Sequence, residues 1–240
     1  MKKSRLKKVM SVLFILCMVF SLVACGSEKT PSDSGKSGET SKESKPASTD
    51  GKMTDVGTPR SETLIVDILS GRIANPDLFN PYVPGSVPMD AGVHQLLHGK
   101  LWEIDTVKGE QYPDLAATMP ELVEGKENTY TFKMKENLKW SDGEVLDAHD
   151  VAFTFNMLMD SQELAFGAVV RETVKSCQAL DDLTVEIVTH KPEPKLSQKF
   201  GVTIFGNGLT VVPEHVWKDE NPATFTYSDP LSSGPYTIKD

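Results

Sequence analysis

Three cysteines in 240 residues are few, and they leave no room for a disulfide framework. Cys17 lies inside an apolar stretch near the N-terminus and Cys25 lies at its end, so Cys177 is the one cysteine of the remaining chain. We expect Cys177 to be a small buried hydrophobic side chain. A reactive thiol is the alternative.

Basic residues are also scarce. The chain has 25 Lys and Arg against 34 Asp and Glu; residues 1–24 carry five of the basic residues and none of the acidic ones, so residues 25–240 have a net charge of −14. An acidic protein of this kind is a poor candidate for binding nucleic acid or anionic lipid headgroups. The charge favours solubility but identifies no ligand.

The common sequence signatures of enzymes are missing. The chain contains no Gly-x-Ser-x-Gly, no phosphate-binding glycine loop and no His-Glu-x-x-His. His94 and His98 are spaced to share one face of a helix, but two ligands do not make a metal site. We therefore expect no catalysis, no metal and no cofactor. An exported hydrolase is the disfavoured alternative, because it would need a nucleophile or metal constellation.

A long hydrophobic run is absent too. Val9 to Ala24 is apolar except for Ser11 and Ser21, follows five basic residues and is too short for a confident membrane span. The order of basic, apolar and small residues before Cys25-Gly26 resembles a bacterial lipobox. This resemblance implies that residues 1–24 are a signal peptide and that Cys25 is acylated, which anchors the protein to a membrane.

Residues 26–60 lack aromatic side chains and are rich in Ser, Lys, Glu, Gly and Thr. Such a segment cannot bury enough apolar surface to fold, so we expect residues 25–60 to be a lipidated cysteine followed by a disordered tether. A long tether after the lipid suits a cell wall that has to be crossed. This points to the outer face of the cell membrane of a Gram-positive organism.

Folded sequence begins near Thr63. Alternation predicts strands at Leu64–Ile68 and at Tyr130–Lys135, and apolar runs predict further strands at 184–189 and 202–205. A helix is expected over Ala91–Leu101. Mixed helices and strands predict an α/β or α+β fold.

A second helix should begin after Asp147, whose carboxylate can cap it, with Asp150 in the first turn. Val151, Phe155 and Leu158 recur at helical spacing and should form its buried stripe. The preceding Ser141-Asp142-Gly143 predicts a tight turn, with Trp140 as a core aromatic behind it.

Six short stretches carry a family resemblance. They are Phe79-Asn80-Pro81-Tyr82, residues 112–116, 130–143, 146–153 and 212–217, and Ser233-Gly234-Pro235-Tyr236. In this order they resemble the family 5 extracellular solute-binding proteins, which are the receptors of ABC importers for peptides, nickel chelates and some oligosaccharides. The motifs are mostly structural, so they indicate the family without supplying a binding site.

The resemblance implies a two-lobed fold around a cleft, with a subdomain inserted in the first lobe. We expect residues 61–85 and 190–240 to be part of the first lobe and residues 86–189 to be the inserted subdomain. Because family members are about twice as long, we expect the chain to hold the N-terminal part of a receptor and to lack the second lobe.

The resemblance implies a monomeric receptor that captures an oligopeptide and delivers it to an ABC permease in the membrane. An oligosaccharide is the rival ligand, because 79–85, 101–103 and 140–144 resemble the sugar-binding branch. A signalling or adhesion lipoprotein is the alternative of another class. We expect Asn75, Asn80, Tyr82 and Trp102 to line the cleft, although Trp102 could instead pack in the core.

Overall fold

The computed structural model describes Pro59, Glu62 and residues 75–87, 93–105, 107–201 and 208–238. These residues all belong to one compact unit, Gly51–Asp240. Several sequence predictions lie outside them: the signal peptide and Cys25, the tether, and the strands at 64–68 and 202–205. Among the described residues, no helix is both long enough and apolar enough to cross a membrane.

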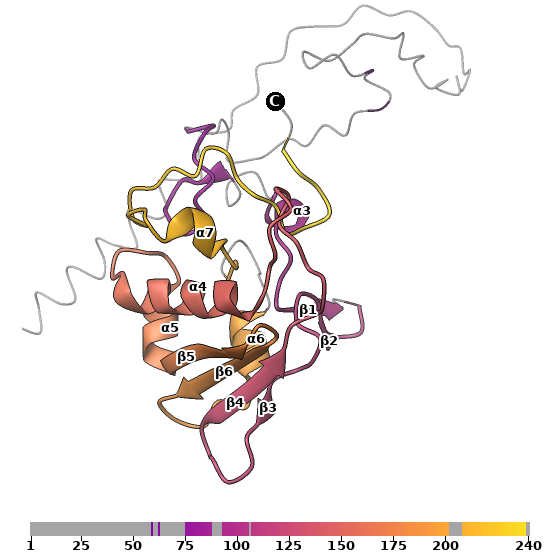
Figure 1. Cartoon of the computed structure of the whole chain (residues 1–240), viewed down its shortest axis with the longest axis vertical. Helices are drawn as coiled ribbons and strands as arrows, with labels where there is room; N and C mark the ends of the chain where they lie inside the picture. The colour runs from indigo at the N-terminus through magenta and orange to yellow at the C-terminus, as the bar shows by residue number, and fades with distance from the viewer. Residues whose placement is uncertain are drawn as a thin grey trace, which may run out of the picture. The chain divides into compact units, whose positions relative to one another are not determined.

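A four-stranded antiparallel sheet forms the lower part of the unit in Figure 1. Its strands are β3 (Glu121–Leu122), β4 (Thr129–Lys133), β5 (Val174–Asp181) and β6 (Thr184–Thr189), in the order β3-β4-β6-β5. Alternating side chains of β4 and β6 enter the core, because successive residues of a strand point to opposite faces. Tyr130, Phe132, Val185 and Ile187 are all buried, which confirms the predicted alternation in β4.

Helix α4 (Ala148–Asp160) packs against β5 and is joined by α5 (Gly167–Thr173), as Figure 1 shows. The predicted stripe is confirmed: Val151, Phe155 and Leu158 are each 0% exposed. The predicted cap is also confirmed, since Asp147 Oδ1 accepts from the His149 N–H at 2.8 Å. Asp150 completes a capping box by accepting from the Asp147 N–H.

Helix α3 is shorter than the sequence predicted. We expected a helix over Ala91–Leu101, but the helix covers only His94–Leu97, and Leu101 lies directly before strand β1 (Trp102–Asp105). β1 pairs antiparallel with β2 (Glu110–Pro113) in a separate two-stranded hairpin. The expectation was therefore wrong for its C-terminal part.

Long-range hydrogen bonds explain where α3 ends. The Leu97 carbonyl accepts from the Ser233 N–H at 3.0 Å and from the Gly234 N–H at 2.9 Å. The Lys100 N–H donates to Asp114 Oδ2 at 2.8 Å. These bonds use backbone groups that a further helical turn would need, and they occur between residues more than ten positions apart.

Segments from both ends of the described chain lie side by side. The Phe79 N–H donates to the Thr226 carbonyl at 2.9 Å, and the Tyr236 N–H donates to the Leu96 carbonyl at 3.1 Å. We call this region, made of residues 75–87, 93–101 and 208–238, the junction. It also contains α7 (Glu214–Trp217), while α6 (Leu196–Phe200) packs against β1.

Candidate functional site

Asn80 lies in the interior of the junction and is 0% exposed. Its Nδ2 donates to the carbonyls of Pro222 and Phe225, both at 2.8 Å, and its Oδ1 accepts from the Tyr82 N–H at 2.9 Å. The Nδ2 bonds therefore join the segment 75–87 to the segment 208–238, while the Oδ1 bond fixes the turn within the segment 75–87. This is the role of a buried polar side chain whose hydrogen bonds are satisfied within the fold.

Tyr82 forms a second link between the segments 75–87 and 208–238 of the junction, and its side chain is buried, with 1% exposed. Its hydroxyl donates to the Thr210 carbonyl and accepts from the Thr210 N–H, the latter at 3.0 Å. Burial raises the pKa of Tyr82, and the hydrogen bond to Thr210 opposes this increase without cancelling it. The phenol therefore stays protonated and able to donate.

Trp102 is completely buried at the start of β1. Its ring packs edge-on against Phe132 with centroids 4.8 Å apart, and its Nε1–H donates to the Thr118 carbonyl at 2.9 Å. A side chain without accessible surface cannot touch a ligand, so the prediction of ligand contact disagrees with this structure for Asn80, Tyr82 and Trp102. Asn75 is exposed, and its role stays a prediction.

The sequence analysis missed Lys100, which is 1% exposed in the junction. Its Nζ donates to Thr210 Oγ1 at 3.1 Å. Burial lowers the pKa of Lys100 to about 8, while the nearby carboxylates of Glu103 and Asp114 act in the opposite direction. A lysine one residue before the apolar pair Leu101-Trp102 was the signal that could have indicated a buried cation.

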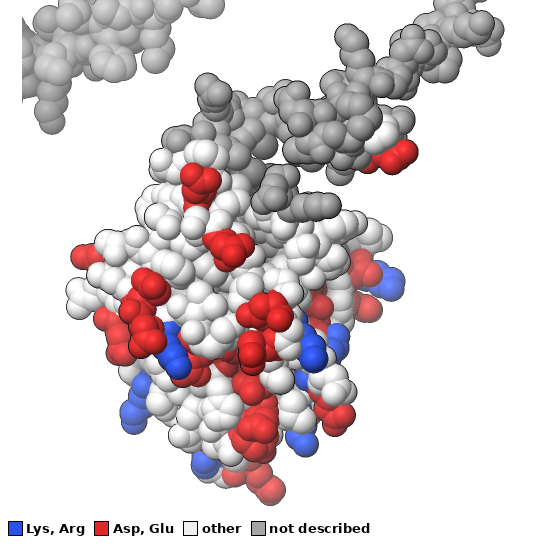
Figure 2. Space-filling model, turned by 45° about the horizontal axis from the view of Figure 1, so that its top comes forward, with Lys and Arg blue, Asp and Glu red and all other residues white. Residues whose placement is uncertain are grey.

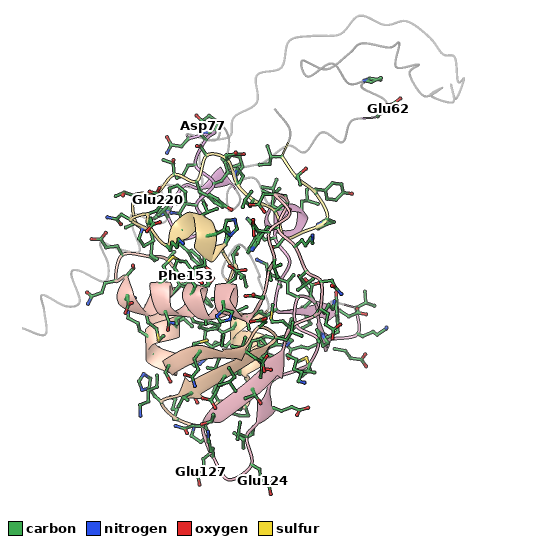
Figure 3. All side chains as sticks on the ribbon, viewed as in Figure 1. Glu62, Asp77, Glu124, Glu127, Phe153 and Glu220 are labelled. Carbon is green, nitrogen blue, oxygen red and sulfur yellow. The ribbon has the colours of Figure 1, made fainter. Side chains whose placement is uncertain are left out.

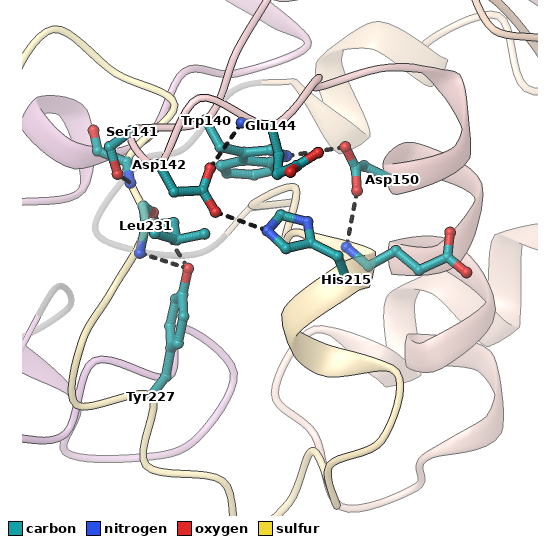
Figure 4. Close-up of polar contacts among 10 residues, drawn as sticks. Trp140, Ser141, Asp142, Glu144, Asp150, His215, Tyr227 and Leu231 are labelled. Atoms are coloured by element: carbon teal, nitrogen blue, oxygen red, sulfur yellow. Dashed lines mark hydrogen bonds and ion pairs between the residues drawn. The ribbon is translucent and has the colours of Figure 1, made fainter.

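Asp150 connects three segments beside the junction (Figure 4). Its Oδ2 accepts from Trp140 Nε1–H at 3.0 Å and from the Asp147 N–H at 3.3 Å, and its Oδ1 accepts from the Glu214 N–H at 2.8 Å. Burial raises the pKa of Asp150, and these three donors act against the increase. The carboxylate thus fixes the first turns of α4 and α7 to the Trp140 turn. Trp140 is 2% exposed, which confirms the prediction of a core aromatic.

A second contact in Figure 4 joins the same turn to α7. His215 Nε2 lies 2.9 Å from Asp142 Oδ2, and both side chains are about one third exposed. Burial by itself raises the pKa of Asp142, but the hydrogen bonds from His215 and the Glu144 N–H, with the charge of His215, bring it below its usual value. The predicted turn at Ser141–Gly143 is confirmed by a Gly143 N–H bond to the Trp140 carbonyl and by a φ of 97° at Gly143.

The described part of the chain contains neither a set of metal ligands nor an accessible thiol. There, no group of three or more His, Cys, Asp or Glu side chains could hold a metal ion. His94 opens α3, and His98 lies just beyond its end. Cys177 in β5 is 5% exposed, and burial raises the pKa of its thiol, so the prediction of a small buried side chain is confirmed.

Solved structures share this fold. One is the oligopeptide-binding protein of an ABC transporter of Thermotoga maritima with mannohexaose bound: TM-score 0.57 and 23% identity, covering 71% of this chain and 30% of that one. Another is the oligopeptide-binding protein AppA of Bacillus subtilis in complex with a nonapeptide: TM-score 0.55 and 23% identity, covering 71% and 33%. At this identity the likeness shows the fold, which is the mixed α/β fold that we predicted.

The sequence of AppA from Bacillus subtilis is 26% identical over 241 residues, covering 97% of this chain and 38% of AppA. The chain covers 38% of AppA and 30% and 33% of the two solved chains, so it spans well under half of the length of these relatives. The family described as bacterial extracellular solute-binding proteins, family 5 Middle, matches residues 110–240, which is more than half of the chain. This family consists of solute-binding receptors and not of enzymes, and the chain belongs to it.

Proposed function

We propose that this chain is the solute-binding part of an extracellular receptor that captures an oligopeptide and delivers it to an ABC permease. The observation that carries the proposal is the family match over residues 110–240. The relative that matches 97% of the chain is named an oligopeptide-binding protein, which supports a peptide ligand. Binding in a cleft that closes around the peptide would bury most of its surface.

The junction supports our proposed division of the chain. Residues 61–85 and 190–240 belong to the first lobe in this proposal, and residues 86–189 form the inserted subdomain. The bonds from Asn80 to Pro222 and Phe225 tie the first two ranges together across more than 140 positions. Residues 93–101, which this division assigns to the inserted subdomain, also contact 232–236 in the same region, so the bonds from Asn80 support the pairing of the first two ranges and not the boundary at residue 86.

The proposed receptor is a monomer held on the outer face of the cell membrane by a lipid on Cys25. The lipobox-like order before Cys25-Gly26 supports this anchor. Mass spectrometry of the mature protein tests it. An acylated N-terminal cysteine is expected for the wild type, and the precursor with Cys25→Ser should keep an uncleaved, unmodified N-terminus. A mature wild-type protein with an unmodified N-terminus at another residue would contradict the proposal.

An oligosaccharide is the second candidate ligand, because one solved structure that shares the fold contains mannohexaose. Calorimetry on the full product of the gene separates the two, with di- to nonapeptides and manno-oligosaccharides as probes. Heat from peptides alone is the expected result. Heat from mannohexaose alone would show that the ligand is an oligosaccharide and not a peptide. Heat from neither probe would contradict the proposal of a peptide or sugar receptor. Among the predicted contacts, Asn75→Ala should then weaken peptide binding, because Asn75 is exposed.

A further inference from the structure

Lys100 is a buried cation that the stability of the fold does not explain. Its side chain is 1% exposed, whereas the Lys and Arg side chains in Figure 2 lie at the surface among more numerous acidic ones. An ammonium group has three donors, and within the described part of the chain Thr210 Oγ1 is its one acceptor, at 3.1 Å. No ion pair of the described residues includes Lys100. Burial of a charge with so few partners costs free energy, so a neutral side chain of this size would stabilise the fold better.

The backbone of Lys100 is held in place by the chain after β2. Its N–H donates to Asp114 Oδ2 at 2.8 Å, and its carbonyl accepts from the Leu115 N–H at 2.7 Å. The preceding Gly99 is packed tightly, since a Cβ there would lie 2.7 Å from Leu115 Cδ2. The ammonium group therefore extends from a fixed base, and the bond that it donates determines where Thr210 lies.

Thr210 connects Lys100 to a third segment of the junction. Its side chain accepts the bond from Lys100, while its backbone N–H and carbonyl both bond to the Tyr82 hydroxyl. Thr210 and Tyr82 are buried, with 2% and 1% exposed. One buried cluster of three side chains thus joins the segments 93–101 and 208–238 to the segment 75–87.

The segment 75–87 carries the turn of Asn75, the exposed residue that we predicted to line the cleft. The Asn75 carbonyl closes this turn by accepting from the Leu78 N–H at 3.2 Å. Asp77 of the same turn lies at one end of the unit, as Figure 3 shows. The position of the turn therefore depends on the anchors that follow it in the chain, and Tyr82 is one of them.

We propose that Lys100 is a positioning residue of the solute site, which acts through Thr210 and Tyr82 on the segment that carries Asn75. The inference rests on the proposed function, because it requires that a solute binds beside this segment. A charge-assisted hydrogen bond is shorter and stronger than a neutral one, so the ammonium group holds Thr210 more closely than a neutral side chain does. Lys100 thereby lowers the stability of the fold and improves the preorganisation of the site.

Calorimetry on the full product of the gene tests the inference, with a pool of nonapeptides of random sequence and mannohexaose as probes. Lys100→Met keeps the length of the side chain and removes its charge. Thr210→Val keeps the shape of the side chain and removes the acceptor. For whichever probe binds the wild type, both variants should raise the dissociation constant about tenfold, which is a typical coupling between separate sites. Lys100→Met should unfold at the same or a higher urea concentration than the wild type.

Lys199 provides a matched control outside the junction. Its Nζ also donates to a threonine hydroxyl, that of Thr173 at 3.2 Å, and to Glu193 at 2.6 Å. Lys199→Met therefore removes an ammonium group and a bond of the same kind, but in α6 and not in the junction. This control should leave the dissociation constant unchanged.

The pH dependence separates positioning from a purely structural role. Burial lowers the pKa of Lys100 to about 8, while Glu103 in β1 and Asp114 after β2 act in the opposite direction. Tyr82 stays protonated because burial raises its pKa. From about pH 7 to about pH 9 the ammonium group loses its proton and the bond to Thr210 weakens, so the wild type should approach the affinity of Lys100→Met. Above about pH 8 the stability of the wild type relative to this variant rises, so affinity and stability should change in opposite directions.

The expected result is weaker binding by Lys100→Met without a loss of stability. Equal binding by the wild type and Lys100→Met would overturn the inference and leave the proposed function intact. A ratio of their dissociation constants that stays constant with pH would overturn it as well, and so would equal weakening by Lys199→Met. Weaker binding together with lower stability of Lys100→Met would make Lys100 a structural residue. A wild type that gives heat with neither probe would contradict the proposed function, and the inference with it.

Discussion

We expect Asp150→Asn to destabilise the fold strongly, although it replaces only one carboxylate oxygen by an NH2 group. The carboxylate is 5% exposed and accepts three hydrogen bonds, from Trp140, Asp147 and Glu214. Asn keeps the shape but supplies only one acceptor oxygen and adds an NH2 group. In one orientation the NH2 group opposes the donors of Trp140 and Asp147, and in the other it opposes the donor of Glu214.

The magnitude follows from the better of these two orientations. At least one buried donor loses its acceptor, which costs about 1–3 kcal/mol, and the remaining bonds lose the strength that a charged acceptor gives them. Removal of a buried charge offsets part of this loss, since burial raises the pKa of Asp150 and so disfavours its ionised form. We therefore expect Asp150→Asn to lower the free energy of unfolding by about 2 kcal/mol.

Equilibrium unfolding in urea measures the effect, with an unchanged m-value as evidence that the unfolded state is the same. Asp160→Asn is the matched control on the same helix, because Asp160 is exposed at the last residue of α4. This control should stay within about 0.5 kcal/mol of the wild type. If Asp150→Asn were no more damaging than Asp160→Asn, the three hydrogen bonds would not hold the segments together and our reasoning would be refuted.

Three further changes test other parts of the fold by the same urea measurement. Asp147→Ala removes the acceptor of the His149 N–H and should cost about 1 kcal/mol, and no loss would mean that the cap does not stabilise α4. Phe155→Ala should cost about 3–5 kcal/mol because the ring is fully buried, and an unchanged stability would place it at the surface. Lys100→Met tests the buried cation through pH. Burial lowers the folded-state pKa of Lys100 to about 8 from its usual 10.5, so the unfolded chain binds the extra proton between these values. Over that range the stability of the wild type should rise by about 3 kcal/mol relative to Lys100→Met, and a parallel pH dependence would contradict the burial of the charge.

Local patterns predicted the elements whose stabilising contacts are local. The alternation in β4, the bounds 184–189 of β6, the turn at 141–143 and the capped start of α4 all depend on residues within a few positions of one another. Helix α3 shows the limit of this approach. Its last turn is replaced by bonds from Leu97 to Ser233 and Gly234, which no periodicity around residue 97 could indicate.

The candidate site was harder to predict for the same physical reason. A polar or aromatic residue in a loop after a strand is a reasonable candidate for ligand contact, and Asn80 and Tyr82 fit that description. Both side chains form hydrogen bonds with backbone groups of residues 210, 222 and 225, which lie far away in the sequence. Contacts with distant residues therefore decide whether such a side chain faces solvent or the interior. Lys100 illustrates the converse: lysine side chains are almost never fully buried, but Thr210 and the packed junction enclose this one. A sequence therefore predicts which residues can make polar contacts, while the long-range pairing decides whether the contact is made with a ligand or with the protein itself.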